Sequence, residues 1–490
     1  MESNIFESQV LNAEAKLSQI VDFIKKEANN LEAHQMEEQL FEQLQKLGVV
    51  LMEEYFTTIE NNDIGNHLTD ENGVELVRHC RKSKNYVSIF GLVKPYRAIY
   101  WSKGQEVVVP LDKQCNLPKS HYSYLVQDMI NSLSVNTPFR ESKEYFKKFF
   151  NQTIHVRQIE EMSDFANEEY EDFYTNKEVP DTSSEGKFQV LSYDGKGVPL
   201  IKKEAAKIIG KLGKGEKRQK KKEALVGVSY TVDENYRSAE EIARNLVYPE
   251  DIDKNSSIDK NRAQNIRRMA SVEQPKIEVI EQILQDSLRR NQTQSRPNIV
   301  LIDGMPSLQK QIEKQIDNRI DYCIILDIIH AAEYIWIAGN TLHGEKTKEG
   351  KQFVYKQLTK ILKGEVGRVI GALKQIITKG EKSEKLSKNK LDALKKVVRY
   401  LSNHRKIMRY DEYLKKGYPI GTGVVESACK QVVKQRMEGS GMRWSIKGAE
   451  NMLMLRSIKT SGDWDNFYEF NVGKLKSKIY ADYQTIKRAS

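Results

Sequence analysis

The stretch Ile-Val-Leu-Ile-Asp-Gly at residues 299–304 is a short apolar run that ends in an acidic residue and a glycine. A run of this length and composition is typical of a strand that is buried on both faces. Residues 323–326 form a second such run, which ends at Asp327, and a helical pattern follows each run. Strands that alternate with helices predict an α/β fold for this part of the chain.

A third strand-like run lies upstream, at residues 188–193, and ends at Asp194. Asp194 and Asp303 are therefore both predicted at the carboxyl edge of a buried strand, where α/β sheets place their ligands. Far downstream, the segment Gly-Thr-Gly-Val-Val-Glu at residues 421–426 predicts a turn that leads into a helix, with Glu426 in its first turn.

Three carboxylates from two strands and one helix suggest a metal site for phosphoryl transfer. Clustered carboxylates repel one another, and a divalent cation removes that cost. Mg²⁺ prefers oxygen ligands, and two such ions about 4 Å apart can activate an attacking oxygen and stabilise a leaving one. Each residue also has a simpler interpretation, because Asp-Gly is an ordinary turn signal and an acidic residue suits a helix N-terminus.

Asp327 and His330 add an ambiguity to this site. Asp327 also ends a strand-like run, so the residues alone leave open whether Asp303 or Asp327 is the second catalytic carboxylate. His330 opens the following helix among apolar residues. It is either a ligand or a packing histidine.

The composition sets outer limits on function. The 490 residues include 78 Lys and Arg against 68 Asp and Glu, a net charge of +10 that favours a polyanionic partner. No uninterrupted apolar run is long enough to span a bilayer, and the N-terminus has no apolar signal region. The four cysteines have no paired spacing, which argues against a disulfide framework or a cysteine zinc site. We therefore expect a cytoplasmic, nucleoid-associated protein.

Hydrophobic periodicity and breaks rich in Gly, Pro and Asn divide the chain into six predicted regions. The first two are an N-terminal helical region at 1–72, and at 73–178 a small β-meander followed by a helix-turn-helix-like DNA-binding region. In the latter, His155, Arg157 and Gln158 stand near the start of a recognition helix, and a plain three-helix packing unit is the alternative. The other regions are the first part of an α/β core (186–345), a helical insertion (346–416), the final core helix with Glu426 (417–460) and a peripheral basic tail (461–490).

Several sequence blocks together resemble the DDE-type insertion-sequence transposases of the ISKra-four family, which are related to Mutator-like transposases. The blocks are Tyr-Asp-Gly-Lys-Gly-Val-Pro at 193–199, Leu-Ile-Asp-Gly-Met-Pro-Ser-Leu at 301–308, Leu-Asp-Ile-Ile-His-Ala-Ala-Glu-Tyr-Ile-Trp at 326–336, and Tyr-Pro-Ile-Gly-Thr-Gly-Val-Val-Glu-Ser-Ala-Cys-Lys at 418–430. The resemblance implies an RNase H-like mixed sheet flanked by helices, with a helical insertion. It assigns the catalytic and metal-binding triad to Asp194, Asp303 and Glu426, and a supporting role to Asp327 and His330.

The resemblance also implies the reaction and the partners. The expected enzyme is a DNA transposase that uses two Mg²⁺ (or Mn²⁺) ions to cleave element ends and join them to target DNA by in-line phosphoryl transfer. Its partners would be double-stranded DNA, as terminal inverted repeats and target, and further copies of the chain. The alternatives are an RNase H-like nuclease without strand transfer and a domesticated, transposase-derived DNA-binding protein.

Basic residues in two segments are candidates for contacts to DNA phosphates, which would give salt-sensitive affinity. A surface of solvated lysines is the alternative for the first segment, and Trp444 either stacks on an extruded base or fills the core. The candidates are Lys217, Arg218, Lys220, Lys221, Lys222, Lys430, Arg436, Arg443 and Trp444.

Overall fold

A computed structural model describes residues 13–59, 63–69, 73–105, 107–208, 220–251, 262–383, 386–480 and 487–488. The chain forms two compact units, one made of residues 1–176 and 464–490 and the other of residues 177–463. The predicted carboxylates all belong to the second unit.

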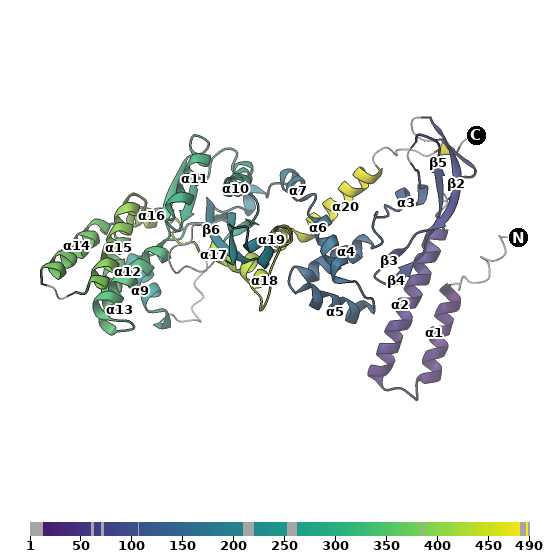
Figure 1. The fold of residues 1–490 in the computed structure, drawn as a ribbon, viewed down its shortest axis with the longest axis horizontal. Helices are drawn as coiled ribbons and strands as arrows, with labels where there is room; N and C mark the ends of the chain where they lie inside the picture. Colours follow the sequence, from purple (N-terminus) through teal and green to yellow (C-terminus); the bar gives the residue numbers. More distant parts are fainter. Residues whose placement is uncertain are drawn as a thin grey trace. The chain divides into compact units, whose positions relative to one another are not determined.

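A five-stranded mixed sheet forms the centre of the second unit (Figure 1). Its strands are β6 (Phe188–Pro199), β7 (Lys221–Val232), β8 (Gln264–Ser271), β9 (Asn298–Ile302) and β10 (Tyr322–Leu326). They lie in the order β10-β9-β6-β7-β8. β6, β9 and β10 run parallel to one another, whereas β7 is antiparallel to both β6 and β8. The predicted α/β fold is present as a mixed sheet flanked by helices.

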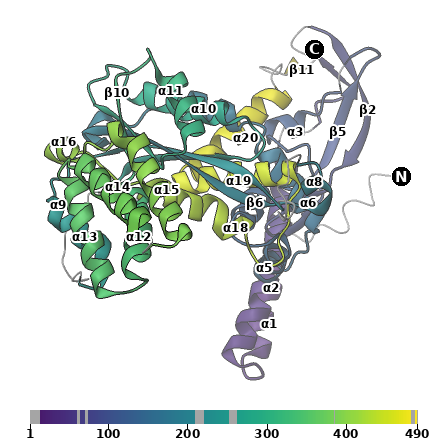
Figure 2. The same ribbon diagram turned by 60° about the vertical axis from the view of Figure 1, so that its left-hand side comes forward.

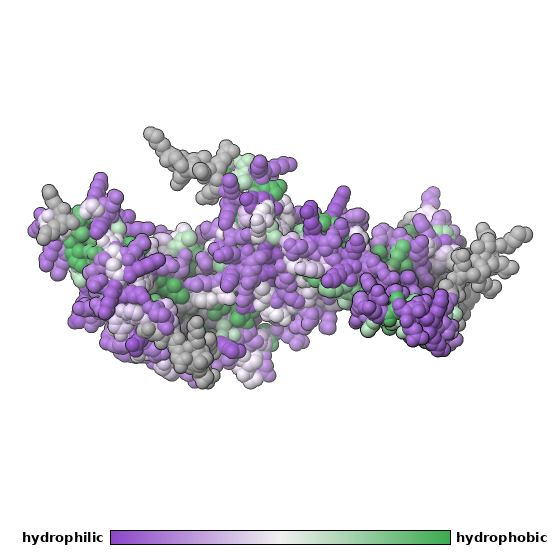
Figure 3. Space-filling model, turned by 90° about the horizontal axis from the view of Figure 1, so that it is seen from below, coloured by the Kyte–Doolittle hydropathy of each residue, from purple (hydrophilic) through white to green (hydrophobic). Residues whose placement is uncertain are grey.

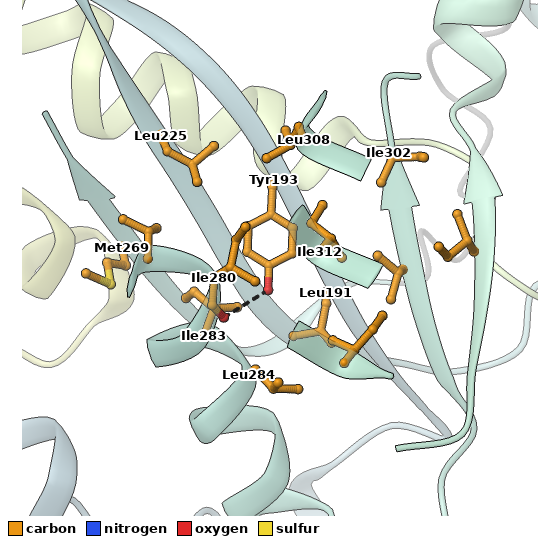
Figure 4. Close-up of a cluster of buried hydrophobic side chains, with 14 of the residues drawn as sticks. Leu191, Tyr193, Leu225, Met269, Ile280, Ile283, Leu284, Ile302, Leu308 and Ile312 are labelled. Atoms are coloured by element: carbon orange, nitrogen blue, oxygen red, sulfur yellow. Dashed lines mark hydrogen bonds between the residues drawn. The ribbon is translucent and has the colours of Figure 1, made fainter. Parts of the chain in front are cut away.

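Helices α10 (Lys276–Arg290) and α11 (Pro306–Ile316) cover one face of the sheet. Leu191 and Tyr193 of β6 pack there against Ile280 and Ile283 of α10, and the Tyr193 hydroxyl donates to the carbonyl of Ile280 at 3.4 Å (Figure 4). Burying a side chain of this size stabilises a fold by about 1.5–3 kcal/mol. The close packing leaves no room for a Cβ at Gly227, where it would lie 2.8 Å from Ile283.

The other face of the sheet is covered by the C-terminal helices α17 (Gly423–Ala428) and α19 (Ile446–Ser461), and α18 (Gln435–Met437) lies between these two helices in the chain. Figure 2 shows α10 and α11 on one side of β6 and α18 and α19 on the other. Between α17 and α18 the helix continues through a wider π-helical segment, η4 (Cys429–Lys434). Such segments are rare and recur at functional sites.

Helices fill the region between β10 and α17. The long ones are α12 (Ile328–His343), α13 (Lys348–Leu362), α14 (Val366–Ser383) and α15 (Lys388–His404), followed by η3 (Arg405–Ile407) and α16 (Tyr410–Lys415). α12 packs against α13 and α15, and α9 (Ala239–Val247) against α13. Short helical turns elsewhere in the unit are η1 (Thr182–Ser184), α8 (Lys202–Ala205) and η2 (Pro249–Asp251).

The first unit combines a helical hairpin, small sheets and a helical group. Its helices are α1 (Ala13–Glu27), α2 (Ala33–Thr57), α3 (Pro110–Gln114), α4 (Tyr124–Ser134), α5 (Phe139–Phe150), α6 (Val156–Ala166), α7 (Tyr170–Asn176) and α20 (Trp464–Tyr480). Its strands are β1 (His67–Thr69), β2 (Glu75–Ser83), β3 (Tyr86–Ser88), β4 (Gly91–Val93), β5 (Tyr96–Trp101) and β11 (Lys487–Arg488).

Two expectations for the first unit need correction. The predicted meander is instead two separate sheets, because β5 pairs with β2, a strand that the sequence did not suggest, and β3 pairs with β4. The predicted peripheral tail contains α20, which packs on this unit: Trp464 Nε1 donates to Asp128 at 2.8 Å, and the ring of Phe467 lies 5.2 Å from that of Phe173.

No helix among the described residues is long and apolar enough to cross a membrane. The face drawn in Figure 3 is mostly hydrophilic, with apolar residues in small groups.

Candidate functional site

Three aspartates stand at the same edge of the sheet because their strands are in register. The parallel pairing of β6 with β9 ends at Ser192 and Leu301, and Asp194 and Asp303 each lie two residues further on. The pairing of β9 with β10 ends at Ile302 and Leu326, so Asp303 and Asp327 are each the next residue. The strands therefore bring Asp194, Asp303 and Asp327 to one edge, as expected from the sequence.

Alternation along the strands turns these aspartates toward one face. Leu191 and Tyr193 of β6, and Val300 and Ile302 of β9, belong to the core beneath α10 and α11. Successive side chains of a strand point to opposite faces, so the residues that follow Tyr193 and Ile302 point to the face that carries α17 and η4. The acidic side chains are thus separated from the main apolar core.

One expectation about β6 is wrong. Asp194 was predicted to end its strand, but β6 continues to Pro199 through its pairing with β7. The glycines after Asp194 permit this: a Cβ at Gly195 would lie 2.8 Å from the Glu223 side chain on β7. Asp194 still lies at the edge of the parallel part of the sheet, because β9 ends beside it.

Glu426 faces the sheet from α17. The helix starts at Gly423, and the Thr422 hydroxyl lies 3.1 Å from Glu426 Oε1 and 2.8 Å from Asp327 Oδ2. One turn further on, the Cys429 thiol donates to Asp194 Oδ2 at 3.3 Å. Burial, and then the negative charge of Asp194, raise the pKa of the Cys429 thiol. Thr422 and Cys429, which sequence reasoning did not select as site residues, therefore link this helix to two of the aspartates.

Among the described residues, Asp327, His330 and Glu426 form a compact group of possible metal ligands at this edge. Each offers one possible ligand atom, and these atoms lie within 4.8 Å of one another. The triad Asp194, Asp303 and Glu426 does not form such a group among the described residues. The structure thus brings together a different set of three from the one that the family resemblance implies.

The hydrogen bonds of Asp327 distinguish it from the other carboxylates. Its side chain is fully buried. Oδ1 accepts from the backbone N–H groups of Ile329 and Thr422 at 3.1 and 3.2 Å, and Oδ2 from His330 Nδ1 at 2.7 Å and the Thr422 hydroxyl at 2.8 Å. Both oxygens are therefore occupied, and Asp327 holds the start of α12 beside the start of α17.

His330 is held by Asp327 and is partly exposed. The hydrogen bond that it donates to Asp327 raises the pKa of His330 to about 9, although burial acts in the opposite direction. The charges of Asp327, Glu333 and Asp303 add to the increase in this pKa. The ring is therefore a cation at neutral pH that faces an acidic edge, and the supporting role that the family resemblance implies for it stays a prediction.

Asp303 is free to bind through one oxygen. Its Oδ1 accepts from the backbone N–H of Met305 at 2.8 Å, and within the described residues Oδ2 has no hydrogen-bond partner. The backbone around it is held by α15: Tyr400 donates to the carbonyl of Asp303 at 3.0 Å, and His404 Nε2 lies 2.9 Å from the carbonyl of Gly304. A Cβ at Gly304, where φ is +88°, would lie 2.8 Å from the Tyr400 hydroxyl. The insertion therefore positions this aspartate.

The donor set at this edge fits a divalent cation. Carboxylate oxygens suit Mg²⁺ and Mn²⁺. Glu426, Asp303 and Asp194 are only partly buried, so their oxygens remain accessible from solvent.

The basic candidates divide by exposure. Lys217 and Arg218 lie outside the described residues, and Lys220, Lys430 and Arg443 are exposed. Lys221 pairs with Glu438 at 2.6 Å, while Lys222 is partly buried.

Arg436 and Trp444 are corrections to the DNA-contact set. Arg436 is 2% exposed and lies over the Trp444 ring, 4.9 Å from its centroid. Trp444 is 8% exposed and donates to the carbonyl of Met437 at 3.2 Å. Both side chains belong to the core in this structure, because apolar packing covers the ring and the guanidinium stacks on it.

The predicted recognition helix is present as α6. It packs with α4 and α5 around Phe146 and Ile159. At its start, the N–H of His155 donates to the Gln158 side chain at 3.1 Å, and Arg157 pairs with Glu161 at 2.9 Å. DNA binding by this segment stays a prediction.

Comparison with known proteins adds one distant structural similarity. No protein-family model matches the chain. No curated protein matches it. Among solved structures, the chain is similar to a Drosophila P element transposase strand transfer complex at 9% identity and a TM-score of 0.25, over 76% of this chain and 86% of that one. A TM-score this low leaves fold and function to be argued from this chain's own residues, and the family resemblance stays a prediction.

Proposed function

We propose that the protein is a metal-dependent DNA transposase that cleaves phosphodiester bonds and joins DNA strands at the acidic edge of the sheet. The observation that carries the proposal is the convergence of Asp194, Asp303 and Asp327 at the ends of three neighbouring parallel strands, opposite Glu426. Building four acidic residues into one partly buried edge costs electrostatic repulsion. A site for cations is the function that justifies this cost.

Asp194, Asp303 and Glu426 are the proposed ligands, because each side chain is partly exposed, whereas Asp327 is fully buried and accepts four hydrogen bonds. Bound Mg²⁺ or Mn²⁺ would neutralise the charge on a phosphodiester and help to activate the attacking oxygen. The two carboxylates on the strands are held by the sheet, and Glu426 by its helix. This rigidity keeps the acidic oxygens aligned before a substrate arrives.

His330 has a separate role in this proposal. Its ring is held by Asp327 and carries a positive charge at neutral pH. It would bind a phosphate oxygen beside the carboxylates and offset part of their repulsion toward DNA. Exposed Lys220, Lys430 and Arg443 would extend this attraction along the DNA backbone, with an affinity that falls as salt rises.

Single substitutions of the proposed ligands test the chemistry. Asp194→Asn, Asp303→Asn and Glu426→Gln are each expected to reduce Mg²⁺-dependent cleavage of labelled element ends by at least about 100-fold. DNA affinity, measured by fluorescence anisotropy, is expected to stay within about threefold of the unmodified chain, since none of the three residues is a cation that binds phosphate.

A matched control is Glu349→Gln, which removes an exposed acidic side chain from the first turn of α13, outside the acidic edge, and should leave cleavage intact. Retention of cleavage in any of the three variants removes that residue from the ligand set. Cleavage without joining of a 3′-OH end to target DNA would instead favour the nuclease alternative.

A further inference from the structure

Helices α1 and α2 form an antiparallel hairpin at the N-terminus of the first unit (Figure 1). The N–H of Ala13 donates to Glu54 at 2.7 Å, which aligns the start of α1 with the end of α2. Ile20, which is buried, and Phe23, which is partly buried, mark the side of α1 that faces α2. This contact uses only one side of each helix.

A second set of large apolar residues on the same two helices remains exposed. Their exposed fractions range from 36% to 51%, although each side chain is of a type usually buried. Residues 41, 44 and 51 are spaced by three and seven, which is the a and d spacing of helices that pack side by side. We define this stripe as Leu17, Val21 and Ile24 of α1 with Phe41, Leu44 and Leu51 of α2.

Both halves of the stripe lie on one side of the hairpin. At about 100° per residue, Leu17, Val21 and Ile24 are rotated by roughly 40–100° from the side of α1 that carries Ile20. The residues of α2 are rotated by roughly 20–120°, in the same sense, from the side that carries Leu40 and Leu47. Because the two helices are antiparallel, side chains that are displaced in the same rotational sense from the contact between the helices lie on the same face of the hairpin.

The area of the stripe matches a dimer interface. Six side chains, each about half exposed, present roughly 500 Å² of apolar surface, given about 150–200 Å² for each when fully exposed. Homodimer interfaces are about 65% apolar, so this corresponds to roughly 800 Å² per copy. That value is close to the ~800 Å² that each partner buries in a standard-sized interface.

We propose that this stripe is a homodimer interface, in which the hairpins of two copies pack face to face as a four-helix bundle. A second copy is the occupant that the geometry favours, because two identical two-helix faces with a and d spacing supply all four helices of such a bundle. Phe90, which packs on Gly48 of α2 and is itself 39% exposed, extends the surface. The proposal does not depend on the chemistry at the acidic edge.

The test is the mass of the full chain in solution, measured by size-exclusion chromatography with light scattering across a range of concentrations. The unmodified chain is expected to have twice the monomer mass. A variant with Leu44→Glu and Leu51→Glu is expected to be monomeric, with a dissociation constant raised by at least about 100-fold, because four carboxylates would be buried per dimer. Both positions are exposed, so the variant should keep its helical circular dichroism.

Two further variants make the test specific. Phe149→Glu, at a residue of α5 that is 51% exposed but off the stripe, should remain dimeric. A variant with Leu44→Lys and Leu51→Lys should be monomeric alone and should form a heterodimer when mixed with the Glu variant, since opposite charges then meet across the interface. Such pairing would show that the stripe contacts its own counterpart.

Residues 1–12 lie outside the described residues and provide the last arm of the test. A chain that lacks residues 2–12 is expected to dimerise as the full chain does. The proposal is overturned if the full chain is monomeric, if it dimerises only after residues 2–12 are removed, or if the Glu variant stays dimeric. In the second case, the occupant of the stripe is the chain's own N-terminal segment.

Discussion

At the residue scale, Asp327 and Glu426 are neighbouring carboxylates with opposite surroundings. Asp327 is buried and accepts hydrogen bonds from Ile329, His330 and Thr422, whereas Glu426 is partly exposed. An amide at residue 327 would direct its NH₂ group toward at least one donor. We therefore expect Asp327→Asn to lower the free energy of unfolding by about 1–3 kcal/mol, the cost of one unsatisfied buried group.

Glu426→Gln is the matched comparison, and its free energy of unfolding should stay within about 0.5 kcal/mol because the site is partly exposed and a like-charge repulsion is relieved. Urea unfolding of both variants at pH 7 without added metal measures the difference. Equal losses of stability in the two variants would contradict the division into a supporting and a metal-binding carboxylate.

The buried pair Glu185 and Arg290 supplies a pH prediction. Burial alone would raise the pKa of Glu185, but hydrogen bonds from Arg290 and Thr231 outweigh it and hold the pKa below its usual value. A lowered acid pKa gives stability that is present above the unfolded pKa of about 4.3 and is lost as pH falls through the folded pKa. The unfolding free energy should therefore fall below about pH 4.3, less steeply in Glu185→Gln.

Arg290→Leu tests the same pair at neutral pH. It leaves an uncompensated charge on Glu185, whose side chain is 1% exposed, and should cost about 3–5 kcal/mol. Adding Glu185→Gln should recover part of that loss in urea unfolding at pH 7. A double variant less stable than Arg290→Leu alone would argue that packing of the arginine dominates.

Sequence patterns located the acidic residues well because each follows a distinct signal. Asp303 and Asp327 end apolar runs, and Glu426 lies just after a glycine turn. The contacts made by Thr422 and Tyr400 could not be predicted, because they join segments that are distant in the chain. Burial of Arg436 was missed for a related reason. A basic residue is expected on the surface, and its contact with the Trp444 ring is visible only in the structure.

At the element scale, α15 of the insertion holds the loop that carries Asp303. The Tyr400 hydroxyl donates to the carbonyl of Asp303, and the Tyr400 ring stacks on Tyr334 of α12 at 3.6 Å. We expect Tyr400→Phe to reduce DNA cleavage about tenfold while DNA affinity stays unchanged, because the ring stays in place and only the alignment of Asp303 is lost. Unfolding should become easier by only about 1 kcal/mol.

The control for this prediction is Tyr355→Phe on α13, which removes a hydroxyl from the same insertion without touching Asp303. Cleavage rates and anisotropy titrations on both variants separate alignment from binding. Wild-type cleavage by Tyr400→Phe would mean that the sheet alone fixes Asp303.

Elements with strong periodicity were easier to predict than elements defined by pairing. The strands β9 and β10 follow from their apolar runs, and residues 331–413 are helical as expected. β2 was missed because its residues include Arg78, Arg81 and Lys82, which do not resemble a buried strand; it is stabilised by pairing with β5. β6 runs past its predicted end for the same reason, since β7 pairs with its second half.

At the scale of the whole molecule, the chain returns to its first unit after completing the second. The first unit consists of residues 1–176 and 464–490. Lys177 and Asp463, the first and last residues of the second unit, form an ion pair at 2.5 Å. The C-terminal segment gives no sequence signal for this return, because the partners of α20 lie about 300 residues away in the chain. Local sequence patterns therefore say little about which distant segments belong to the same unit.

The return of α20 predicts that the C-terminus stabilises the N-terminal unit selectively. Phe467 is 3% exposed and packs edge-to-face on Phe173 of α7. Phe467→Ala should therefore destabilise the first unit by about 3–5 kcal/mol, the usual cost of removing a buried aromatic ring. In differential scanning calorimetry, we expect the transition of the first unit to move to lower temperature while the transition of the second unit stays unchanged.

Ile283→Ala in α10 is the reciprocal control, since it should shift only the transition of the second unit. If both transitions moved together in either variant, the units would be folding as one cooperative body.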